Sequence, residues 1–421
     1  MNQPKSWIEI PENSDFTLAN IPFGVYSKGK GHFAVATAVG EYIVDLDMLH
    51  KAGYFGLLEL PKNIFSSRYL NPFIALGKEK TNTVRKYIQE LFTKGSTLEK
   101  DSKCLVNVLH KQQEVKMLLP VKIGNYTDFY SSKEHATNVG IMFRDPENAL
   151  LPNWLHMPVG YHGRASSIVV SETPIHRPNG QIKDTAKEMP DFGPSKRLDF
   201  ELEMAFVIGK ETQLGDMVSV NKAEEYIFGM MLFNDWSARD IQVWEYVPLG
   251  PFLGKNFASS VSPWIVTIEA LEPFRTNAPE QTVEVLPYLK EKQRTTFDIQ
   301  LEVAIAAKET KEKVVCQSNF KHLYWTMPQQ LAHHTINGCN IEIGDMYASG
   351  TISGTTPESF GSMLELVWKG SKPLQLADGS TRVFIQDGDT VIMRGHAGEG
   401  TQRVGFGCVQ TEVLPAKEVE L

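Results

Sequence analysis

The run Asp199–Phe206, DFELEMAF, decides how the centre of this chain folds. Its even-numbered positions are apolar, whereas Glu201 and Glu203 share the odd parity. Alternation with a period of two predicts a β-strand with one buried face. Because side chains at positions i and i+2 point to the same face of a strand, the two carboxylates are expected side by side, roughly 7 Å apart.

A second group of polar side chains follows the apolar run Phe228–Phe233. Asp235, Arg239 and Gln242 recur at i, i+4 and i+7, which is the spacing of one helical face. Asn234 or Asp235 fits the N-cap of such a helix. Carboxylates brought together in this way repel one another unless a cation joins them. The two groups together predict a hard-metal site with a cationic rim.

The composition indicates a globular protein. With 421 residues, the chain is long enough for two domains, or for one large and one small domain. A net charge of −8 without basic blocks argues against nucleic acid as a partner. No apolar run reaches the roughly 18 residues that a membrane span needs, and the first residues lack the apolar core of a secretory signal. Four cysteines without a Cys-x-x-Cys pair argue against a zinc site or disulfide framework and favour a cytoplasmic location.

Turns and polar segments divide the chain into two predicted domains. Short strands punctuated by glycine are expected over residues 23–45, followed by helices near 45–52 and 83–92. The polar stretch Thr93–Lys103 is interpreted as a connector. We therefore expect an N-terminal domain over residues 1–118 and a catalytic domain over residues 119–421. The second of these is strand-rich with few helices, which predicts a mainly β fold.

The second domain begins with a segment that joins an acid to a histidine. Asp128 and His135 share one face of a predicted helix that Thr127 or Asp128 caps. Taken alone, a plain helix cap and a half-buried structural histidine are the commoner roles of these residues. Much later, Glu365 lies inside the apolar run 362–368, which we interpret as a strand. A buried carboxylate in that run needs a partner, because an unpaired buried charge is costly.

Two widespread catalytic motifs do not fit this sequence. Gly250–Asn256 resembles a phosphate-binding loop but is one residue short between its glycines, and it has Asn where Ser or Thr should hold magnesium. No Gly-x-Ser-x-Gly sequence marks a hydrolase serine. The clustered carboxylates offer only oxygen, which suits Ca²⁺ at about 2.3–2.6 Å or Mg²⁺ at about 2.0–2.1 Å. The alternative is that they are separate surface carboxylates on unrelated elements.

Several long stretches of the sequence resemble the fumarylacetoacetate hydrolase family. They cover residues 126–144, 151–170, 199–209, 234–257, 348–354 and 362–370. The resemblance implies a small N-terminal β-barrel domain, a larger β-sandwich roll and assembly as a homodimer. It also implies metal-dependent hydrolysis of a carbon–carbon bond in 4-fumarylacetoacetate, a small dianionic β-diketo acid. The products, fumarate and acetoacetate, end tyrosine and phenylalanine breakdown.

The same resemblance implies roles for individual residues. A Ca²⁺ or Mg²⁺ ion is expected at Asp128, Glu201, Glu203 and Asp235. A second, weaker ion position is expected at Asp235, Lys255 and Ser259. His135 matches the general base, with Glu365 orienting it. The groups that match stabilisers or donors for developing negative charge are Arg239, Gln242 and Lys255. The residues that match substrate contacts are Tyr130, Arg144, Tyr161, Gln242, Tyr246 and Thr351.

Three departures from the family pattern are visible, and one is the turn Gly354–Pro357, which differs a little from the family's turn. Asn125 stands beside the metal loop where Asp is common, and Ser259 stands where Thr is usual. We expect both to tune the metal site without removing a catalytic group. The remaining alternatives are a related enzyme that acts on acylpyruvates or another β-diketo acid, and a metal-stabilised binding protein without turnover.

The chemistry of the expected substrate agrees with these roles. Hydrolytic cleavage of a carbon–carbon bond needs a leaving group able to carry charge on carbon. A β-diketone meets this need because its enolate chelates a metal through two oxygens. A histidine with an ordinary pKa of about 6.5, held by a carboxylate, takes a proton from water at neutral pH.

Overall fold

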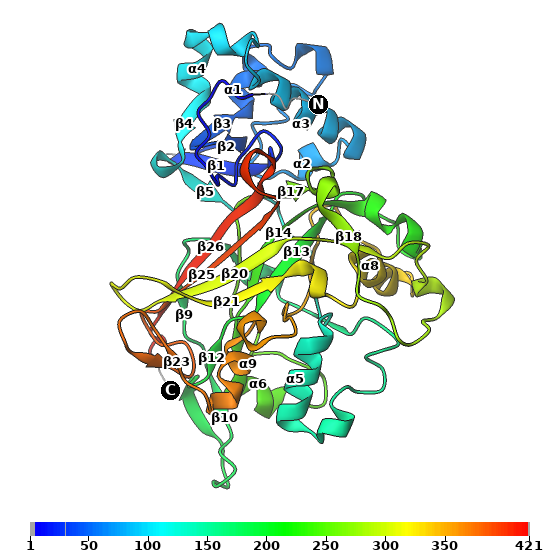
Figure 1. The fold of residues 1–421 in the computed structure, drawn as a ribbon, viewed down its shortest axis with the longest axis vertical. Helices are drawn as coiled ribbons and strands as arrows, with labels where there is room; N and C mark the ends of the chain where they lie inside the picture. Colours follow the sequence, from blue (N-terminus) through cyan, green and yellow to red (C-terminus); the bar gives the residue numbers. More distant parts are fainter. Residues whose placement is uncertain (1–4, 30, 420–421) are drawn as a thin grey trace.

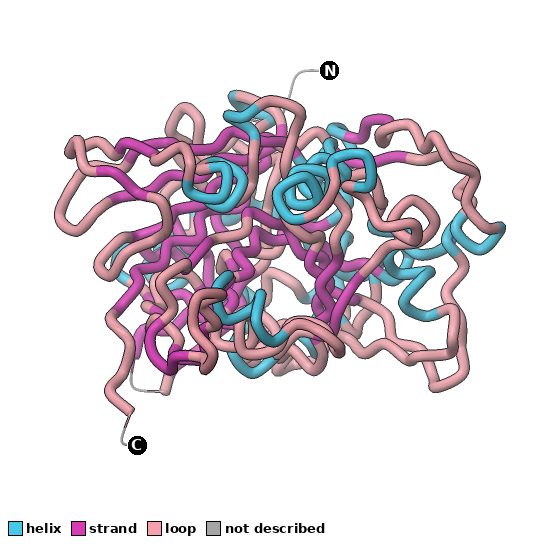
Figure 2. Tube along the Cα trace, turned by 90° about the horizontal axis from the view of Figure 1, so that it is seen from below, coloured by secondary structure: helices cyan, strands magenta, loops and turns pink. Residues whose placement is uncertain are grey.

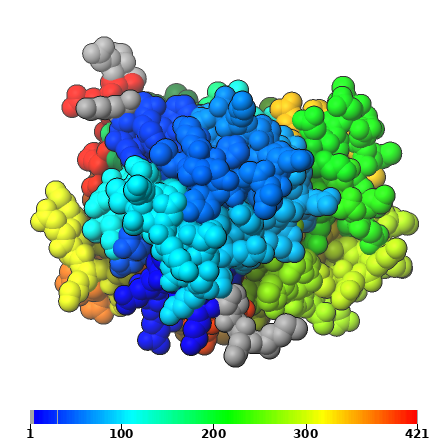
Figure 3. All heavy atoms as spheres, turned by 90° about the horizontal axis from the view of Figure 1, so that it is seen from above, coloured from blue at the N-terminus to red at the C-terminus, as the bar shows by residue number. Residues whose placement is uncertain are grey.

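The computed structural model describes residues 5–29 and 31–419, and its elements form two groups along the long axis (Figure 1). The N-terminal elements gather at one end, and the longer strands of the remaining chain extend away from them. Seen from above, N-terminal residues in blue and cyan cover the middle of that end (Figure 3). Within the described ranges, no helix is long and apolar enough to cross a membrane.

The N-terminal group is built on a five-stranded antiparallel sheet in the order β4-β3-β2-β1-β5. Its strands are β1 (Gly24–Gly29), β2 (His32–Val39), β3 (Tyr42–Asp45), β4 (Leu109–Lys111) and β5 (Lys116–Leu118). Its helices are α1 (Leu46–Lys51), α2 (Asn71–Ile74), α3 (Lys78–Leu91) and α4 (Ser102–Val108). The predicted helix after Asp45 is confirmed. Helix α3 begins before the predicted start near residue 83, because its buried face already includes Thr81 and Gly77 is its N-cap.

The central sheet has the order β7-β6-β22-β13-β14-β16-β8, with β17 paired to β14. Its strands are β6 (Tyr126–Phe129), β7 (Gly160–His162), β8 (Ile168–Val170), β13 (Leu202–Ile208), β14 (Ile227–Asp235), β16 (Ser259–Val261), β17 (Val266–Thr267) and β22 (Met346–Ala348). The predicted strand Asp199–Phe206 is confirmed from Leu202 onward, where it begins β13; Asp199 belongs to β12 (Leu198–Asp199), and Glu201 forms an isolated bridge with Ser362. Strand β13 lies between β14 and β22, so it is central in the sheet.

The alternation predicted a strand with one buried face, but strand β13 is buried on both faces. Its even-numbered side chains, including Met204 and Phe206, enter the core shared with the next sheet. Ala205 and Val207 belong to a second core that contains Phe73 of the N-terminal group. The N-terminal group therefore covers a sheet face that would otherwise meet solvent.

A third sheet in the order β21-β20-β25-β26-β9 packs against the even-numbered side of β13. Its strands are β9 (Ile175–His176), β20 (Gln300–Ala306), β21 (Lys313–Asn319), β25 (Thr390–Ala397) and β26 (Val404–Leu414). Two-stranded sheets pair β10 (Asn179–Ile182) with β11 (Asp191–Pro194), β12 (Leu198–Asp199) with β15 (Ser237–Ala238), β18 (Arg275–Asn277) with β19 (Thr295–Phe297), and β23 (Leu374–Gln375) with β24 (Thr381–Arg382). The remaining α-helices are α5 (Lys133–Phe143), α6 (Arg239–Glu245), α7 (Ile268–Leu271), α8 (Met327–Thr335) and α9 (Met363–Leu366). Figure 2 shows these strands joined by long loops, which agrees with the predicted mainly β fold.

The two groups of elements are joined by backbone and by apolar contacts. Phe23 and Ile265 exchange two backbone hydrogen bonds, with N···O distances of 2.9 and 2.8 Å. Phe23 also packs against Phe73 and Phe228, at ring-centroid distances of 4.8 and 6.3 Å. Residues on both sides of position 118 therefore share one apolar core.

Candidate active site

Three carboxylates meet near the ends of strands β6, β13 and β14. Asp128, Glu203 and Asp235 are each 1% exposed. One oxygen from each side chain lies within 4.8 Å of the others, an arrangement that could hold a metal ion. We call Asp128, Glu203 and Asp235 the acidic triad.

The elements that carry two of these acids differ from those predicted. Asp128 lies in strand β6 rather than at a helix cap, because its segment pairs with β22 and β7. Helix α5 begins later, and Ser132 is its N-cap. Asp235 is the last residue of β14 rather than part of a helix, because the strand continues its pairing with β16 to that point. Helix α6 begins only at Arg239. Strand ends, not helix faces, therefore present these two acids.

Each of two triad residues has one satisfied and one unsatisfied oxygen. Asp128 Oδ2 accepts a hydrogen bond from the Tyr126 hydroxyl at 2.5 Å, and Glu203 Oε2 accepts one from Gly350 N at 2.9 Å. Asp128 Oδ1 and Glu203 Oε1 are buried without a hydrogen-bond partner. A buried acceptor without a partner costs roughly 1–3 kcal/mol. An all-oxygen donor set with two such atoms fits a hard dication.

The charges in the triad oppose one another. Burial raises the pKa of Asp128 well above its ordinary value, and the neighbouring Asp235 raises it further. Burial likewise raises the pKa of Glu203, and Asp128 and Asp235 add to the effect. A cation bound among these oxygens would favour their ionised forms.

Two buried cations border the triad. Lys255 Nζ forms ion pairs with Glu201 and with Asp235, the latter at 2.6 Å. Arg239 Nη2 lies 2.7 Å from Glu201 Oε1, and its Nε donates to Asp199 Oδ2 at 2.8 Å. Glu201 therefore lies beside the triad with its oxygens paired to these cations. Burial alone would raise the pKa of Glu201, but Lys255 and Arg239 hold it below its ordinary range.

Both cations stay protonated in this setting. Burial acts to lower the pKa of Lys255, yet Asp235 and Glu201 raise it above its usual value. Burial also acts to lower the pKa of Arg239, and Glu201 and Asp199 raise it. The site thus contains fixed positive charge next to its excess of carboxylates.

His135 and Glu365 form a buried pair near the charged side chain of Glu201. His135 Nδ1 lies 2.6 Å from Glu365 Oε2, with side-chain exposures of 3% and 0%. Burial opposes the ionisation of Glu365, but His135 and several hydrogen-bond donors lower its pKa. A carboxylate that accepts from Nδ1–H leaves Nε2 free to accept another proton.

Glu365 lies in the short helix α9, not in a strand as predicted. Ser362 accepts at the helix N-terminus as its N-cap. Asp199 accepts from Met363 N at 2.7 Å and from Leu364 N at 3.1 Å. These hydrogen bonds at the helix N-terminus favour a helical turn over the extended chain that the apolar run indicated.

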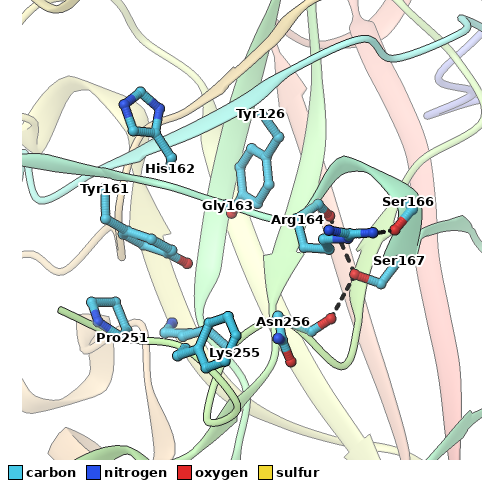
Figure 4. A pocket seen from close by; sticks show the side chains of 11 residues that line it. Tyr126, Tyr161, His162, Gly163, Arg164, Ser166, Ser167, Pro251, Lys255 and Asn256 are labelled. Atoms are coloured by element: carbon cyan, nitrogen blue, oxygen red, sulfur yellow. Dashed lines mark hydrogen bonds between the residues drawn. The ribbon is translucent and has the colours of Figure 1, made fainter. Parts of the chain in front are cut away.

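A pocket of about 380 Å³ opens beside the triad. Figure 4 shows Tyr161 and Lys255 on one side of it and Arg164, Ser166 and Ser167 on the other. The Tyr161 hydroxyl donates to Asp235 Oδ2 at 2.7 Å, so the pocket adjoins an acid of the triad. The segment 250–256, which had resembled a phosphate loop, contributes Pro251, Phe252, Lys255 and Asn256 to the wall.

The predicted substrate contacts fall into two sets. Tyr130 packs edge-on against His135 at a centroid distance of 5.2 Å, and Tyr161 contacts the triad. Thr351 is 2% exposed, and its hydroxyl has no hydrogen-bond partner.

The second set is more open to solvent. Tyr246 is 48% exposed. Arg144 is exposed and donates to the Ala149 carbonyl at 2.6 Å. Gln242, on α6, is half-buried and lies against Gly254.

Some supporting residues were not predicted from the sequence. Tyr126 holds Asp128, and Asp199 holds both Arg239 and the start of α9. Tyr126 and Asp128 are two positions apart, so a strand reading of residues 126–129 would have placed them on one face. Asp199 joins segments far apart in the chain, and no local pattern reveals such a contact.

These features place an acidic triad that could hold a metal ion beside a buried histidine–carboxylate pair, in a mainly β fold. Residues 125–414 match the fumarylacetoacetate hydrolase C-terminal model, and residues 19–120 match the fumarylacetoacetase N-terminal model. The chain belongs to the fumarylacetoacetate hydrolase family.

Known relatives are similar over nearly the whole chain. The chain is 50% identical to the fumarylacetoacetase of Bos taurus over 414 residues, which cover 98% of this chain and 99% of that relative. It is 51% identical to the fumarylacetoacetase of Dictyostelium discoideum over 419 residues, or 98% of each chain. A solved fumarylacetoacetate hydrolase from the psychrophilic Exiguobacterium antarcticum is 17% identical, with a TM-score of 0.52 over 94% of this chain and 100% of that one. That likeness shows the fold.

Proposed function

We propose that this chain hydrolyses 4-fumarylacetoacetate to fumarate and acetoacetate, the last step of tyrosine and phenylalanine catabolism. The observation that carries this proposal is the acidic triad beside the His135–Glu365 pair. The identity of about half of all residues to fumarylacetoacetases supports the choice of substrate.

We propose that Asp128, Glu201, Glu203 and Asp235 hold a Ca²⁺ or Mg²⁺ ion. The two unpartnered carboxylate oxygens of the triad support an oxygen-ligated ion. A bound dication supplies Lewis-acid stabilisation of negative charge on the two diketone oxygens. A second, weaker ion position at Asp235, Lys255 and Ser259 is supported by the closeness of Ser259 Oγ to Asp235 Oδ1, which lie 3.2 Å apart. The protonated Lys255 borders this position and offers no lone pair to an ion.

His135 acts as the general base in this proposal. Glu365 accepts from Nδ1, so Nε2 takes a proton from water. The water oxygen attacks the ketone carbon that is bonded to the carbon–carbon double bond, and this carbon becomes a carboxylate carbon of fumarate. The bond from that carbon to the neighbouring methylene then breaks, its electron pair passes to the acetoacetate fragment as an enolate, and that fragment takes up a proton to become acetoacetate.

Arg239, Gln242 and Lys255 stabilise or protonate the negative charge that develops. Arg239 and Lys255 are fixed by ion pairs with Asp199, Glu201 and Asp235, so little reorganisation is needed during the reaction. Removing one preorganised donor of this kind typically costs about 3–4 kcal/mol of transition-state stabilisation.

The dianionic substrate needs partners at both of its carboxylate ends. We assign these contacts to Tyr130, Arg144, Tyr161, Gln242, Tyr246 and Thr351. Arginine binds carboxylates through charge-assisted hydrogen bonds. Arg144 is exposed at the end of α5, the helix that carries His135, which supports its role at one end of the substrate.

We further infer a homodimer of two-domain chains, divided near residues 118 and 119. The two separate family matches support the division. An exposed apolar segment supports self-association: Val247, Leu249 and Phe252 are 66%, 98% and 64% exposed. We also infer a cytoplasmic location, which the free cysteines of the described residues support.

The direct test is turnover of fumarylacetoacetate, followed by the loss of its ultraviolet absorbance in the presence of Mg²⁺ or Ca²⁺. We expect cleavage to fumarate and acetoacetate. Cleavage of acylpyruvates without cleavage of fumarylacetoacetate would replace this substrate with the related one. Metal binding without any turnover would leave only a binding protein.

A further inference from the structure

The loop 349–354 contacts both halves of the active site. Gly350 N donates to Glu203 Oε2 at 2.9 Å, which ties the start of the loop to the acidic triad. Ser353 Oγ donates to Glu365 Oε2 at 2.9 Å, which ties its end to the His135–Glu365 pair. Only a few residues separate these two contacts, so the loop fixes the triad and the pair relative to each other.

Both the hydroxyl and the backbone carbonyl of Ser353 form hydrogen bonds in this part of the site. It is fully buried, and its Oγ accepts from Gly361 N at 2.9 Å while donating to Glu365. Its carbonyl accepts from Ser132 Oγ at 3.1 Å. Ser132 in turn accepts from His135 N at 3.1 Å as the N-cap of α5. Ser353 therefore contacts the helix that carries His135 as well as the carboxylate of Glu365.

The carboxylate of Glu365 is held from both sides. Oε2 accepts from His135 Nδ1, from Ser353 Oγ and from Ser362 Oγ, at 2.6, 2.9 and 2.8 Å. Oε1 accepts from Asn138 Nδ2 at 2.9 Å. Donors on both oxygens prevent rotation of the carboxylate, and they spread its negative charge over several hydrogen bonds.

We propose that Ser353 is a positioning residue for the general base, acting through both Glu365 and the N-cap of α5. This proposal rests on the proposed function. Ser353 does not touch the substrate. Its hydroxyl sets the direction and the basicity of the Glu365 carboxylate, and its carbonyl fixes the start of the His135 helix.

The test compares Ser353→Ala with Ser318→Ala. Ser318 is also buried, and its Oγ donates to the Ile352 carbonyl of the same loop at 2.9 Å rather than to Glu365. Removing a residue that orients a functional group through a hydrogen bond typically lowers activity by about 10- to 100-fold. We expect such a loss of kcat in Ser353→Ala, with KM unchanged, and a much smaller loss in Ser318→Ala. Ser353→Thr, which keeps the hydroxyl, is expected to restore most of the rate.

The pH profile separates positioning from a structural role. Glu365 with one donor fewer interacts more strongly with protonated His135, so the acid limb of kcat/KM moves to higher pH in Ser353→Ala. A merely structural role lowers the amount of active protein and leaves that limb in place. If Ser353→Ala does not fold, Ser353→Cys keeps the side-chain volume with only a weak donor and takes its place.

A measurement that does not depend on turnover distinguishes the positioning role of Ser353 from the proposed hydrolase function. In the proton NMR spectrum, the Nδ1 proton shared by His135 and Glu365 is expected to give a low-field resonance. The resonance is assigned by its absence from the spectrum of His135→Gln. Ser353→Ala is expected to shift it, and Ser318→Ala to leave it unchanged. Absence of turnover in the native protein contradicts the proposed function, whereas the resonance still tests the positioning role. An unchanged resonance, or equal kinetic losses in Ser353→Ala and Ser318→Ala, overturns the role of Ser353.

Discussion

His135 Nδ1 lies 2.6 Å from Glu365 Oε2, although the two residues are 230 positions apart in the chain. Both side chains are almost fully buried. The bond fixes the imidazole so that Nε2 faces away from the carboxylate. Proton transfer by a general base, the role proposed for His135, typically contributes about 10²- to 10⁴-fold to the rate.

His135→Gln tests the base directly. We expect turnover to fall by about 10²- to 10⁴-fold, because glutamine cannot accept the proton from water. Metal affinity, measured by calorimetry with Ca²⁺ and Mg²⁺, is expected to stay close to that of the native protein, since His135 is not in the acidic triad. Retained turnover would remove His135 as the base, and lost metal binding would show that it acts on the ion instead.

Glu365→Gln tests the partner of the base. Glutamine keeps the shape of the side chain but carries no charge, so protonated His135 loses its stabilising anion. We expect kcat to fall by about a hundredfold or more, as for other bases that lose an orienting carboxylate. Circular dichroism checks that the fold is kept. Glu358→Gln, an exposed change nearby in sequence, serves as the control and is expected to have no effect.

Asp128→Asn tests the acidic triad through stability. Because burial and Asp235 raise the pKa of Asp128, its ionised form is costly among the other acids. In chelator, the neutral amide is therefore expected to raise the melting temperature. The native protein is expected to gain about 2.7 kcal/mol of stability at a metal concentration of 100 Kd, and Asp128→Asn to gain much less. Equal metal-dependent stabilisation of both proteins would contradict the triad as the ion site.

The buried His334 is expected to make the stability of the protein depend on pH. Burial, together with His162 and His333, lowers the pKa of His334 to about 4, and its Nδ1 bonds the Tyr347 hydroxyl at 2.8 Å. The unfolded chain therefore binds more protons than the folded chain between about pH 6.5 and 4. The contribution of neutral His334 to the free energy of unfolding is complete above about pH 6.5 and is lost as the pH falls from about 6.5 to 4.

His334→Gln is accordingly expected to flatten the fall in melting temperature between pH 6.5 and 4. His156→Gln, at an exposed position, is the matched control and is expected to keep the native slope. Parallel curves for the native protein and His334→Gln would show that His334 does not contribute to the acid sensitivity.

The sequence located the chemistry better than it located the elements. The alternation around Glu203 predicted a strand, and that strand is β13. The helical spacing of Asp128 and His135 was misleading, because Asp128 belongs to β6, whose pairing with β22 joins residues more than 200 positions apart. Local periodicity cannot reveal such a partner. The same limit applies to Glu365, whose helical turn depends on Asp199.

The site residues were identified by resemblance, whereas the contacts that hold them were not. The roles proposed for His135 and Glu365 follow from matching motifs, whereas the contacts of Ser353 with Glu365 and of Gly350 with Glu203 are tertiary. The second buried face of β13 was also missed. It is covered by the N-terminal group, and no pattern within β13 itself indicates that cover.

Gly350→Ala tests whether the loop must approach β6 as closely as it does. Gly350 has a φ of +77°, and a Cβ there would lie 2.2 Å from the Phe129 carbonyl oxygen. The alanine therefore pays for a left-handed backbone, about 1–3 kcal/mol, and must also push the loop away from β6. That displacement weakens the bond from Gly350 N to Glu203. We expect a lower melting temperature and reduced Ca²⁺ and Mg²⁺ affinity. Gly193→Ala, where a Cβ would meet no atom within 4 Å, is expected to change neither. Native metal affinity in Gly350→Ala would mean that Glu203 does not depend on the loop for its position.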